Sequence, residues 1–201
     1  MIPFPQHFRM IEVRNIGDSD FKRVSLELLL LLSVVTNVTC TQNDKPIALN
    51  IGDPAPSLRV GAWMKGAPIK RLEKGQVYVL EFWATWCKPC KEMFPKLRKL
   101  HESKRSEGLE VIALTRHYMA FRGPAESMIA ERQLMLDMVT EYGVNFHVGI
   151  AEDERLQGVY GANGLPTVLL IDRSGIIRYA GPGEDDMTFN KQLQQCLEHP
   201  A

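Results

Sequence analysis

Trp83-Ala84-Thr85-Trp86-Cys87-Lys88-Pro89-Cys90 is the stretch that decides the fold of this chain. It follows an almost wholly apolar, β-rich run over residues 77–83 and precedes a long basic segment that is compatible with a helix. The two cysteines therefore stand where a strand gives way to a helix. Unpaired N–H groups and partial positive charge at a helix N-terminus favour the thiolate of the first cysteine. The second cysteine, one turn on, can close a disulfide with it, so the pair is predicted to switch between dithiol and disulfide.

A metal site is the alternative use of such a pair. Structural zinc needs four ligands, usually from a second cysteine pair or from two histidines at short spacing. The other cysteines are Cys40 and Cys196, and the five histidines are scattered along the chain. Lys91 follows Cys90, so the attachment pattern of a c-type haem is absent. We therefore predict redox chemistry without a metal or another cofactor.

Several segments, in the right order, resemble the thioredoxin-fold thiol–disulfide oxidoreductases of the TlpA/ResA (redoxin) type. Ile51-Gly52-Asp53-Pro54-Ala55-Pro56 is similar to the opening of that family, and Gly164-Leu165-Pro166-Thr167 is similar to its cis-proline loop. The resemblance runs from about Ile51 to about Leu197. It implies a thioredoxin-like α/β three-layer sandwich with a mixed central sheet, an N-terminal hairpin and a central strand–helix insertion.

Hydrophobic spacing and breaker residues place the individual elements. An N-terminal hairpin is expected from residues 58–63 and 69–72, and further strands at 76–83, 109–114, 146–150, 168–172 and 176–180. Helices are expected at 89–107, 128–142, 153–160 and 185–197. The apolar residues that recur with helical spacing in the second of these are Met128, Leu134, Met135, Met138, Val139 and Tyr142.

The cysteines are assigned different chemical roles. Cys87 comes first, at the helix start, and is the predicted nucleophile, and Cys90 resolves the mixed disulfide that Cys87 forms with a substrate. Lys88 adds a positive neighbour that lowers the thiol pKa, and Pro89 suits the first helical turn. These two residues tune the reduction potential, but they do not indicate whether the protein reduces or oxidises.

Glu81 is the one charged residue in an otherwise apolar strand, six positions before Cys87. The resemblance implies that a buried acid at this spacing accepts the proton of the second cysteine, and burial raises such a pKa. A solvent-facing glutamate is the alternative. The ResA-like pattern has a glutamate three residues after the second cysteine, where this chain has Met93 and carries Glu92 one position earlier.

Three further residues are predicted to contact the substrate. The resemblance implies that Pro166 follows a cis peptide bond facing the cysteines, with an ordinary trans proline as the alternative. It also implies that Leu165 lines the substrate groove. Trp86 is expected at the rim beside Cys87, whereas Trp83 is expected in the core.

Composition bounds the class of protein. The chain has 201 residues, of which 45% are hydrophobic, enough for one packed domain plus an extension. Lysine plus arginine and aspartate plus glutamate are equal at 24 each, so no charge excess points to nucleic acid. We expect a monomer with a domain over residues 46–199.

Residues 1–45 are expected to form a leader. Lys22-Arg23 precede an apolar run over 28–35, a pattern that suggests a secretory signal and a location outside the cytoplasm. Cys40 stands where a lipoprotein would carry its lipid and so be anchored to a membrane. An ordinary N-terminal helix, or a true start at Met10, is the alternative.

The predicted function is disulfide exchange with protein substrates through a mixed disulfide, as a reductant supplied by an upstream electron donor. A peroxiredoxin-type thiol peroxidase is one alternative, although its Pro-x-x-x-Thr-x-x-Cys pattern is not matched because Thr85 stands two residues before Cys87. A copper carrier that combines the cysteines with His117 or His147 is the other.

Overall fold

The computed structural model describes residues 49–119, 125–183 and 186–199, and the expected leader with Cys40 lies outside them. One six-stranded sheet forms the centre, in the order β1–β4–β3–β2–β5–β6. Strands β2, β3 and β4 run parallel, whereas β1, β5 and β6 pair antiparallel with their neighbours. The expected mixed sheet is therefore confirmed. Its strands are β1 (Val60–Lys65), β2 (Val77–Phe82), β3 (Leu109–Thr115), β4 (His147–Ala151), β5 (Thr167–Ile171) and β6 (Ile177–Gly181).

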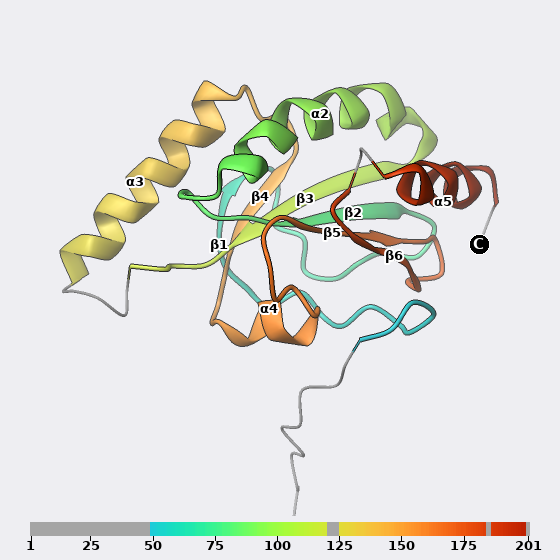
Figure 1. The fold of residues 1–201 in the computed structure, drawn as a ribbon, viewed down its shortest axis with the longest axis horizontal. Coiled ribbons are helices and arrows are strands. Elements are labelled where there is room, and N and C mark those ends of the chain that lie inside the picture. The colour runs from blue at the N-terminus through green and yellow to red at the C-terminus, as the bar shows by residue number, and fades with distance from the viewer. Residues whose placement is uncertain (1–48, 120–124, 184–185, 200–201) are drawn as a thin grey trace, which may run out of the picture. The chain divides into compact units, whose positions relative to one another are not determined.

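Helices cover both faces of this sheet and make the three expected layers (Figure 1). The helices are α2 (Lys88–Lys104), continued by the 3₁₀ turn η2 (Arg105–Glu107), α3 (Ala125–Glu141), α4 (Arg155–Val159) and α5 (Met187–Glu198). Helices α2, α3 and α5 lie on one face and α4 on the other. The expected insertion is present, because α3, β4 and α4 separate the β2–α2–β3 unit from the β5–β6–α5 unit. None of the described helices has the length and apolar character needed to cross a bilayer.

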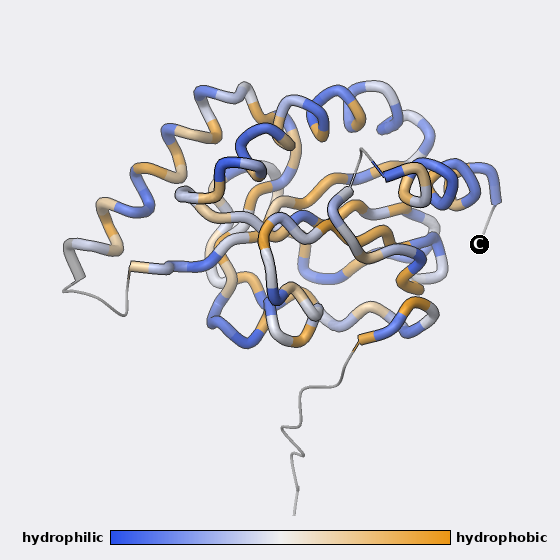
Figure 2. The backbone as a smooth tube through the Cα atoms, in the orientation of Figure 1, coloured by the Kyte–Doolittle hydropathy of each residue, from blue (hydrophilic) through white to orange (hydrophobic). Residues whose placement is uncertain are grey.

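Strand β2 is buried along its whole length and divides the core into two clusters. Side chains alternate between the faces of a strand, so Val77 and Val79 pack under α2 while Tyr78, Leu80 and Phe82 pack towards α4. Figure 2 shows hydrophobic residues concentrated along the central strands and hydrophilic ones on the outer side of α2. A strand covered on both faces has to be apolar throughout, which explains the continuous run in the sequence.

The predicted N-terminal hairpin is wrong. Strand β1 forms close to the expected place, but it pairs antiparallel with β4, and residues 69–72 form no strand. Pro68 has no N–H group to donate to a ladder, and the carbonyl of Ala67 instead accepts a 3.0 Å hydrogen bond from His147 Nδ1. Ile69 and Leu72 still pack against the α4-side cluster, which accounts for their apolar character.

The end of α2 is fixed at Gly108, whose φ of 86° lies in the left-handed region that favours glycine. The guanidinium group of Arg173, beside this turn, donates hydrogen bonds to the carbonyls of Gly75 (2.6 Å), Glu107 (2.7 Å) and Leu197 (3.2 Å). One side chain thus joins the segments before β2, after α2 and at the end of α5. These contacts hold α2, and with it the cysteine pair, against the sheet.

Candidate active site

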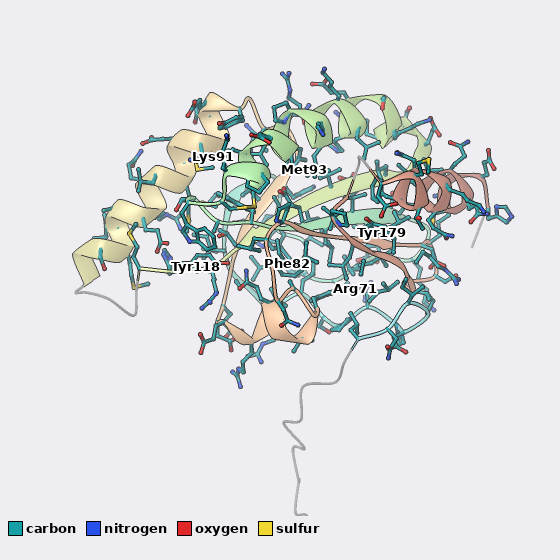
Figure 3. All side chains as sticks on the ribbon, in the orientation of Figure 1. Arg71, Phe82, Lys91, Met93, Tyr118 and Tyr179 are labelled. Carbon is teal, nitrogen blue, oxygen red and sulfur yellow. A yellow bond between two sulfur atoms is a disulfide. The ribbon has the colours of Figure 1, made fainter. Side chains whose placement is uncertain are left out.

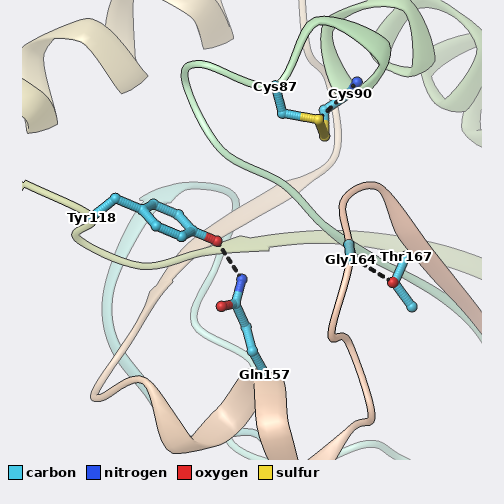
Figure 4. The surroundings of a disulfide bond; sticks show 6 residues. All are labelled: Cys87, Cys90, Tyr118, Gln157, Gly164 and Thr167. Carbon is cyan, nitrogen blue, oxygen red and sulfur yellow. Dashed lines mark hydrogen bonds between the residues drawn. A yellow bond between two sulfur atoms is a disulfide. The ribbon is translucent and has the colours of Figure 1, made fainter.

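The cysteine pair lies where β2 passes into α2 (Figure 4). Cys87 is the N-cap of α2, and its Sγ atom accepts a 3.3 Å hydrogen bond from the backbone N–H of Cys90. The two Sγ atoms form a disulfide of 2.03 Å. When this bond is reduced, the N–H groups of the first turn favour negative charge on the Cys87 sulfur, because the helix end carries partial positive charge.

Little of the pair is exposed to solvent. Cys87 keeps 3% of its surface exposed and Cys90 none, so what access exists belongs to the first cysteine. Pro89 occupies the first turn, as expected, and that turn contains no acidic residue. The Lys88 ammonium group is exposed and lies 4.0 Å from the Glu92 carboxylate, an arrangement that contributes little energy in water.

Glu81 is fully buried near the end of β2, which excludes the solvent-facing alternative. By strand alternation its side chain shares the face of Val79 and Trp83, which pack in the same cluster as both cysteines. Neither carboxylate oxygen has a hydrogen-bond partner among the described residues. Burial therefore raises the pKa of Glu81 well above the ordinary glutamate value, because the charged form loses its hydration without compensation.

The position of the ResA-like acid is apolar in this chain. Met93 is buried on the sheet side of α2 (Figure 3), and Glu92 is exposed on another face of the helix. Of these two glutamates on β2 and α2, Glu81 is therefore the one that is buried.

The loop before β5 has the expected proline geometry. The Leu165–Pro166 peptide bond is cis, which confirms the prediction from the sequence. The Thr167 hydroxyl donates a 2.7 Å hydrogen bond to the carbonyl of Gly164 and closes the loop (Figure 4). Leu165 packs against both core clusters.

A groove of about 510 Å³ opens beside the pair, between the loop after β3, helix α4 and the cis-proline loop. It brings together Trp86 and Leu165, two of the three residues that the sequence predicts at a substrate surface; the third, Pro166, does not line it. Trp86 is 63% exposed, and its ring stands 5.5 Å from that of Tyr118 at an interplanar angle of 82°. The groove also contains charged and polar side chains from separate parts of the chain, namely Arg116, Glu154 and Gln157.

The chain thus combines a cysteine pair at a strand-to-helix junction with a cis-proline loop, and the Redoxin family model matches it over residues 50–195. The chain belongs to the redoxin family.

Curated relatives of this redoxin carry the name thiol–disulfide oxidoreductase ResA. The protein from Bacillus thuringiensis is 34% identical over 152 residues, which cover 74% of this chain and 80% of the relative. The protein from Bacillus cereus is 31% identical over 174 residues, which cover 85% of this chain and 91% of the relative. The redoxin described here is accordingly a thiol–disulfide oxidoreductase.

Solved structures confirm the fold. A thiol–disulfide isomerase from Corynebacterium glutamicum superimposes with a TM-score of 0.59 at 24% identity, over 73% of this chain and 97% of the other. The thioredoxin domain of a thiol–disulfide oxidoreductase from Bacteroides vulgatus gives a TM-score of 0.58 at 19% identity, over 74% and 99%. At these identities the likeness is one of fold, and it establishes the thioredoxin-like sandwich.

Sequence reasoning missed part of the redoxin's groove. Arg116 and Tyr118 belong to the loop after β3, for which no element was expected. On α3, Met128 and Leu134 were counted with the apolar face but are exposed, whereas Glu131 is fully buried. Glu131 lies on the same face of α3 as the buried residues Met135 and Met138. A charged residue at the helical spacing of an apolar face was therefore the signal that could have indicated its burial.

Within the described ranges, the third cysteine and the two histidines considered above as copper ligands lie apart from the pair or have other contacts. Cys196 is a free, buried thiol on α5, and burial raises its pKa to about 11, so almost none is ionised at neutral pH. His147 contacts Ala67 and lies 3.5 Å from Glu110, near the amino end of β3, whereas the pair follows the carboxyl end of β2. His117 lies closer to the groove, with its Nδ1 3.2 Å from Glu131.

Proposed function

We propose that this redoxin reduces disulfides in client proteins, with Cys87 as the nucleophile and Cys90 as the resolving thiol. The observation that carries the proposal is the position of Cys87, at the N-cap of α2 and next to the groove. The Cys87 Sγ atom accepts a hydrogen bond from the backbone N–H of Cys90, and Cys87 is the cysteine that retains solvent access. A client sulfur can approach Cys87 without first displacing Cys90.

The reaction conserves atoms and electrons over two exchanges. The Cys87 thiolate attacks one sulfur of the client disulfide, the client S–S bond breaks, and its second sulfur leaves as a thiolate that takes up a proton. Cys90 then loses its proton and attacks Cys87 Sγ, which releases the first client sulfur. Two electrons have passed from the cysteine pair to the client, and the pair ends as the disulfide seen in the structure.

Glu81 is the proposed acceptor of the Cys90 proton. Val79 and Trp83, which share a strand face with Glu81, belong to the buried cluster that contains Cys90, and the raised pKa of Glu81 makes its carboxylate a stronger base than an exposed glutamate would be. Water is scarce at this position, because Glu81 and Cys90 are both fully buried. A buried carboxylate on the adjoining strand is therefore the base that we propose for the buried thiol.

Trp86, Leu165 and Pro166 are the proposed contacts for the client backbone and side chains around its cysteine. Two of the three line the groove, and the third directly follows Leu165. Lys88 and Pro89 are proposed to adjust the reduction potential through their places in the first turn of α2.

The proposed setting is outside the cytoplasm, where disulfide-bonded clients persist. The basic and apolar pattern of residues 22–35 supports export, and Cys40 would supply a membrane anchor. The redoxin would act there as a monomer on protein thiols and disulfides. An upstream dithiol donor must restore the reduced pair after each cycle.

The reduction potential of the pair tests the direction of electron flow. We expect a value near that of thioredoxin, about −270 mV, and catalysed reduction of insulin by dithiothreitol. Equilibration against glutathione or dithiothreitol buffers, followed by thiol alkylation and mass spectrometry, measures the potential. A value near about −120 mV would identify an oxidant and overturn the proposed direction.

Replacement of Glu81 by glutamine tests the proton acceptor. We expect the mixed disulfide on Cys87 to resolve about 10²-fold more slowly near neutral pH, which is the lower end of the effect of a general base. The deficit should shrink at alkaline pH, where the Cys90 thiol ionises without help. Rapid quenching of the mixed disulfide formed with a chromogenic thiol measures the rate.

The matched control is Glu92→Gln, which changes an exposed glutamate on the active-site helix itself. We expect it to resolve at the wild-type rate. Slow resolution in Glu92→Gln with normal resolution in Glu81→Gln would transfer the role to Glu92.

A further inference from the structure

Glu131 is a fully buried carboxylate that the redox chemistry does not use. It lies in the core-facing stripe of α3, yet its oxygens are fully engaged with the loop that follows β3. The backbone N–H groups of Tyr118 and Met119 donate to it at 2.9 Å and 3.2 Å, and His117 Nδ1 lies 3.2 Å away. These partners compensate the Glu131 carboxylate for the hydration that it loses on burial, so the loop and Glu131 depend on each other.

These contacts fix a loop that forms one wall of the groove. The hydroxyl of Tyr118 accepts a 2.6 Å hydrogen bond from Gln157 Nε2 on α4 (Figure 4), and its ring packs edge to face with Trp86, the neighbour of Cys87. The Arg116 guanidinium lies 4.5 Å from the centre of the Tyr118 ring. Tyr118 is therefore fixed by three contacts: its backbone N–H with Glu131, its hydroxyl with Gln157 and its ring with Trp86.

The charges along this wall neutralise each other. Arg116 donates to Gln157 Oε1 at 2.9 Å and to Glu154 Oε2 at 3.0 Å, so the cation and the anion are already paired. Beside these paired polar groups, two large apolar side chains are exposed, the ring of Trp86 in the groove and the side chain of Met119 in the loop after β3. Because the charged groups already have partners, these two apolar side chains are the contacts that the wall offers to an apolar side chain next to the client cysteine.

We propose that Glu131 is a positioning residue that selects protein clients by holding Tyr118 against Trp86. The proposal rests on the function proposed above. The client it fits is an extended segment with an apolar side chain beside its disulfide. A small disulfide reaches Cys87 without touching the wall, so its reduction does not depend on Glu131.

Two substrates separate this role from the chemistry. The dithiol form of the redoxin is mixed with insulin, or with 2-hydroxyethyl disulfide, and the second-order rate constants are measured by stopped flow. We expect Glu131→Gln and Tyr118→Ala each to lower the insulin rate by about tenfold, as loss of one well-packed aromatic contact does. The rate with 2-hydroxyethyl disulfide should not change. Glu141→Gln, an exposed glutamate on the same helix, should leave both rates at the wild-type value.

The double variant tests whether Glu131 acts through Tyr118. We expect the insulin rate constant of the Glu131→Gln, Tyr118→Ala double variant to equal that of Tyr118→Ala alone, because Tyr118→Ala already removes the contact with Trp86. If the rate reductions of the two single variants multiply in the double variant, Glu131 acts by another route and the positioning role is overturned. If Glu131→Gln does not fold, Tyr118→Ala decides the matter, since an unchanged ratio of the two rates would remove the wall from client selection.

The outcomes for the inference and for the function are distinct. A wild-type redoxin that reduces both substrates, with variants that lose both rates equally or neither, would overturn the inference alone. A wild-type dithiol that reduces neither substrate would overturn the proposed function, and the inference with it.

Discussion

Replacing Cys90 by serine should convert the redoxin into a covalent trap for its clients. Cys87 still attacks the client disulfide, but no second thiol is present to release it, so the mixed disulfide accumulates. Replacing Cys87 by serine should remove the reaction itself and lower turnover by about 10⁴-fold or more, as loss of a nucleophile does. Non-reducing electrophoresis and intact-mass measurement with insulin distinguish the two variants.

Cys196→Ser provides the control, because that thiol is buried and its raised pKa keeps it protonated. It should turn over like the wild type. The assignment of roles is reversed if Cys87→Ser accumulates the adduct and Cys90→Ser does not. An adduct that forms equally in both variants would show that the N-cap position does not decide which sulfur attacks.

Replacing Glu81 by glutamine should stabilise the protein at neutral and alkaline pH. Glu81 is buried with no hydrogen-bond partner in the described part of the chain, and its pKa in the folded protein lies well above the ordinary value that applies when the chain is unfolded. Between those two values the folded protein binds more protons than the unfolded chain, so the free energy of unfolding falls as pH rises. The stability is fully present below the unfolded pKa and is lost as pH rises towards the folded one.

The glutamine variant lacks this titration, so its advantage over the wild type should grow with pH. The slope of the difference should approach about 1.4 kcal/mol for each pH unit above the ordinary glutamate pKa. Urea denaturation of the oxidised proteins between about pH 4 and about pH 8 measures it. The free energy of unfolding of Glu92→Gln should change with pH in parallel with that of the wild type. Parallel curves for Glu81→Gln as well would show that Glu81 titrates normally and would weaken its role as a base.

The two expectations for Glu81→Gln express one physical cause. The same burial that destabilises the ionised carboxylate makes it a base for Cys90. Stability and resolution rate should therefore change in opposite directions in this variant. Proteins commonly accept such a cost at a functional site.

Elements with strong local signals were predicted closely. Strand β2 was expected from its continuous apolar run, α2 from its position after the cysteines, and its end from Gly108. The elements that were misjudged depend on distant partners. Strand β1 pairs with β4 rather than with the segment that follows it, because the edge of the sheet offers a ladder that residues 69–72 do not.

The site divides in the same way. The cysteine pair could be named from residue type and short spacing, whereas the buried acid and the cis-proline were expected from the resemblance to the redoxin family. The wall of the groove could not, because its members are separated along the chain. Arg116 and Gln157, for example, are 41 residues apart and meet only after α4 has packed on the sheet.

The sequence alone determined the chemistry of this redoxin: a thiol pair at a strand-to-helix junction, with an acid in the preceding strand. These features depend on residue identity and on backbone geometry within a few residues, which local sequence encodes. The tertiary structure decided which surface surrounds the reactive sulfur. Burial of Glu131 and the position of Tyr118 result from packing between α3, α4 and the loop after β3, and contacts between distant segments leave no local pattern.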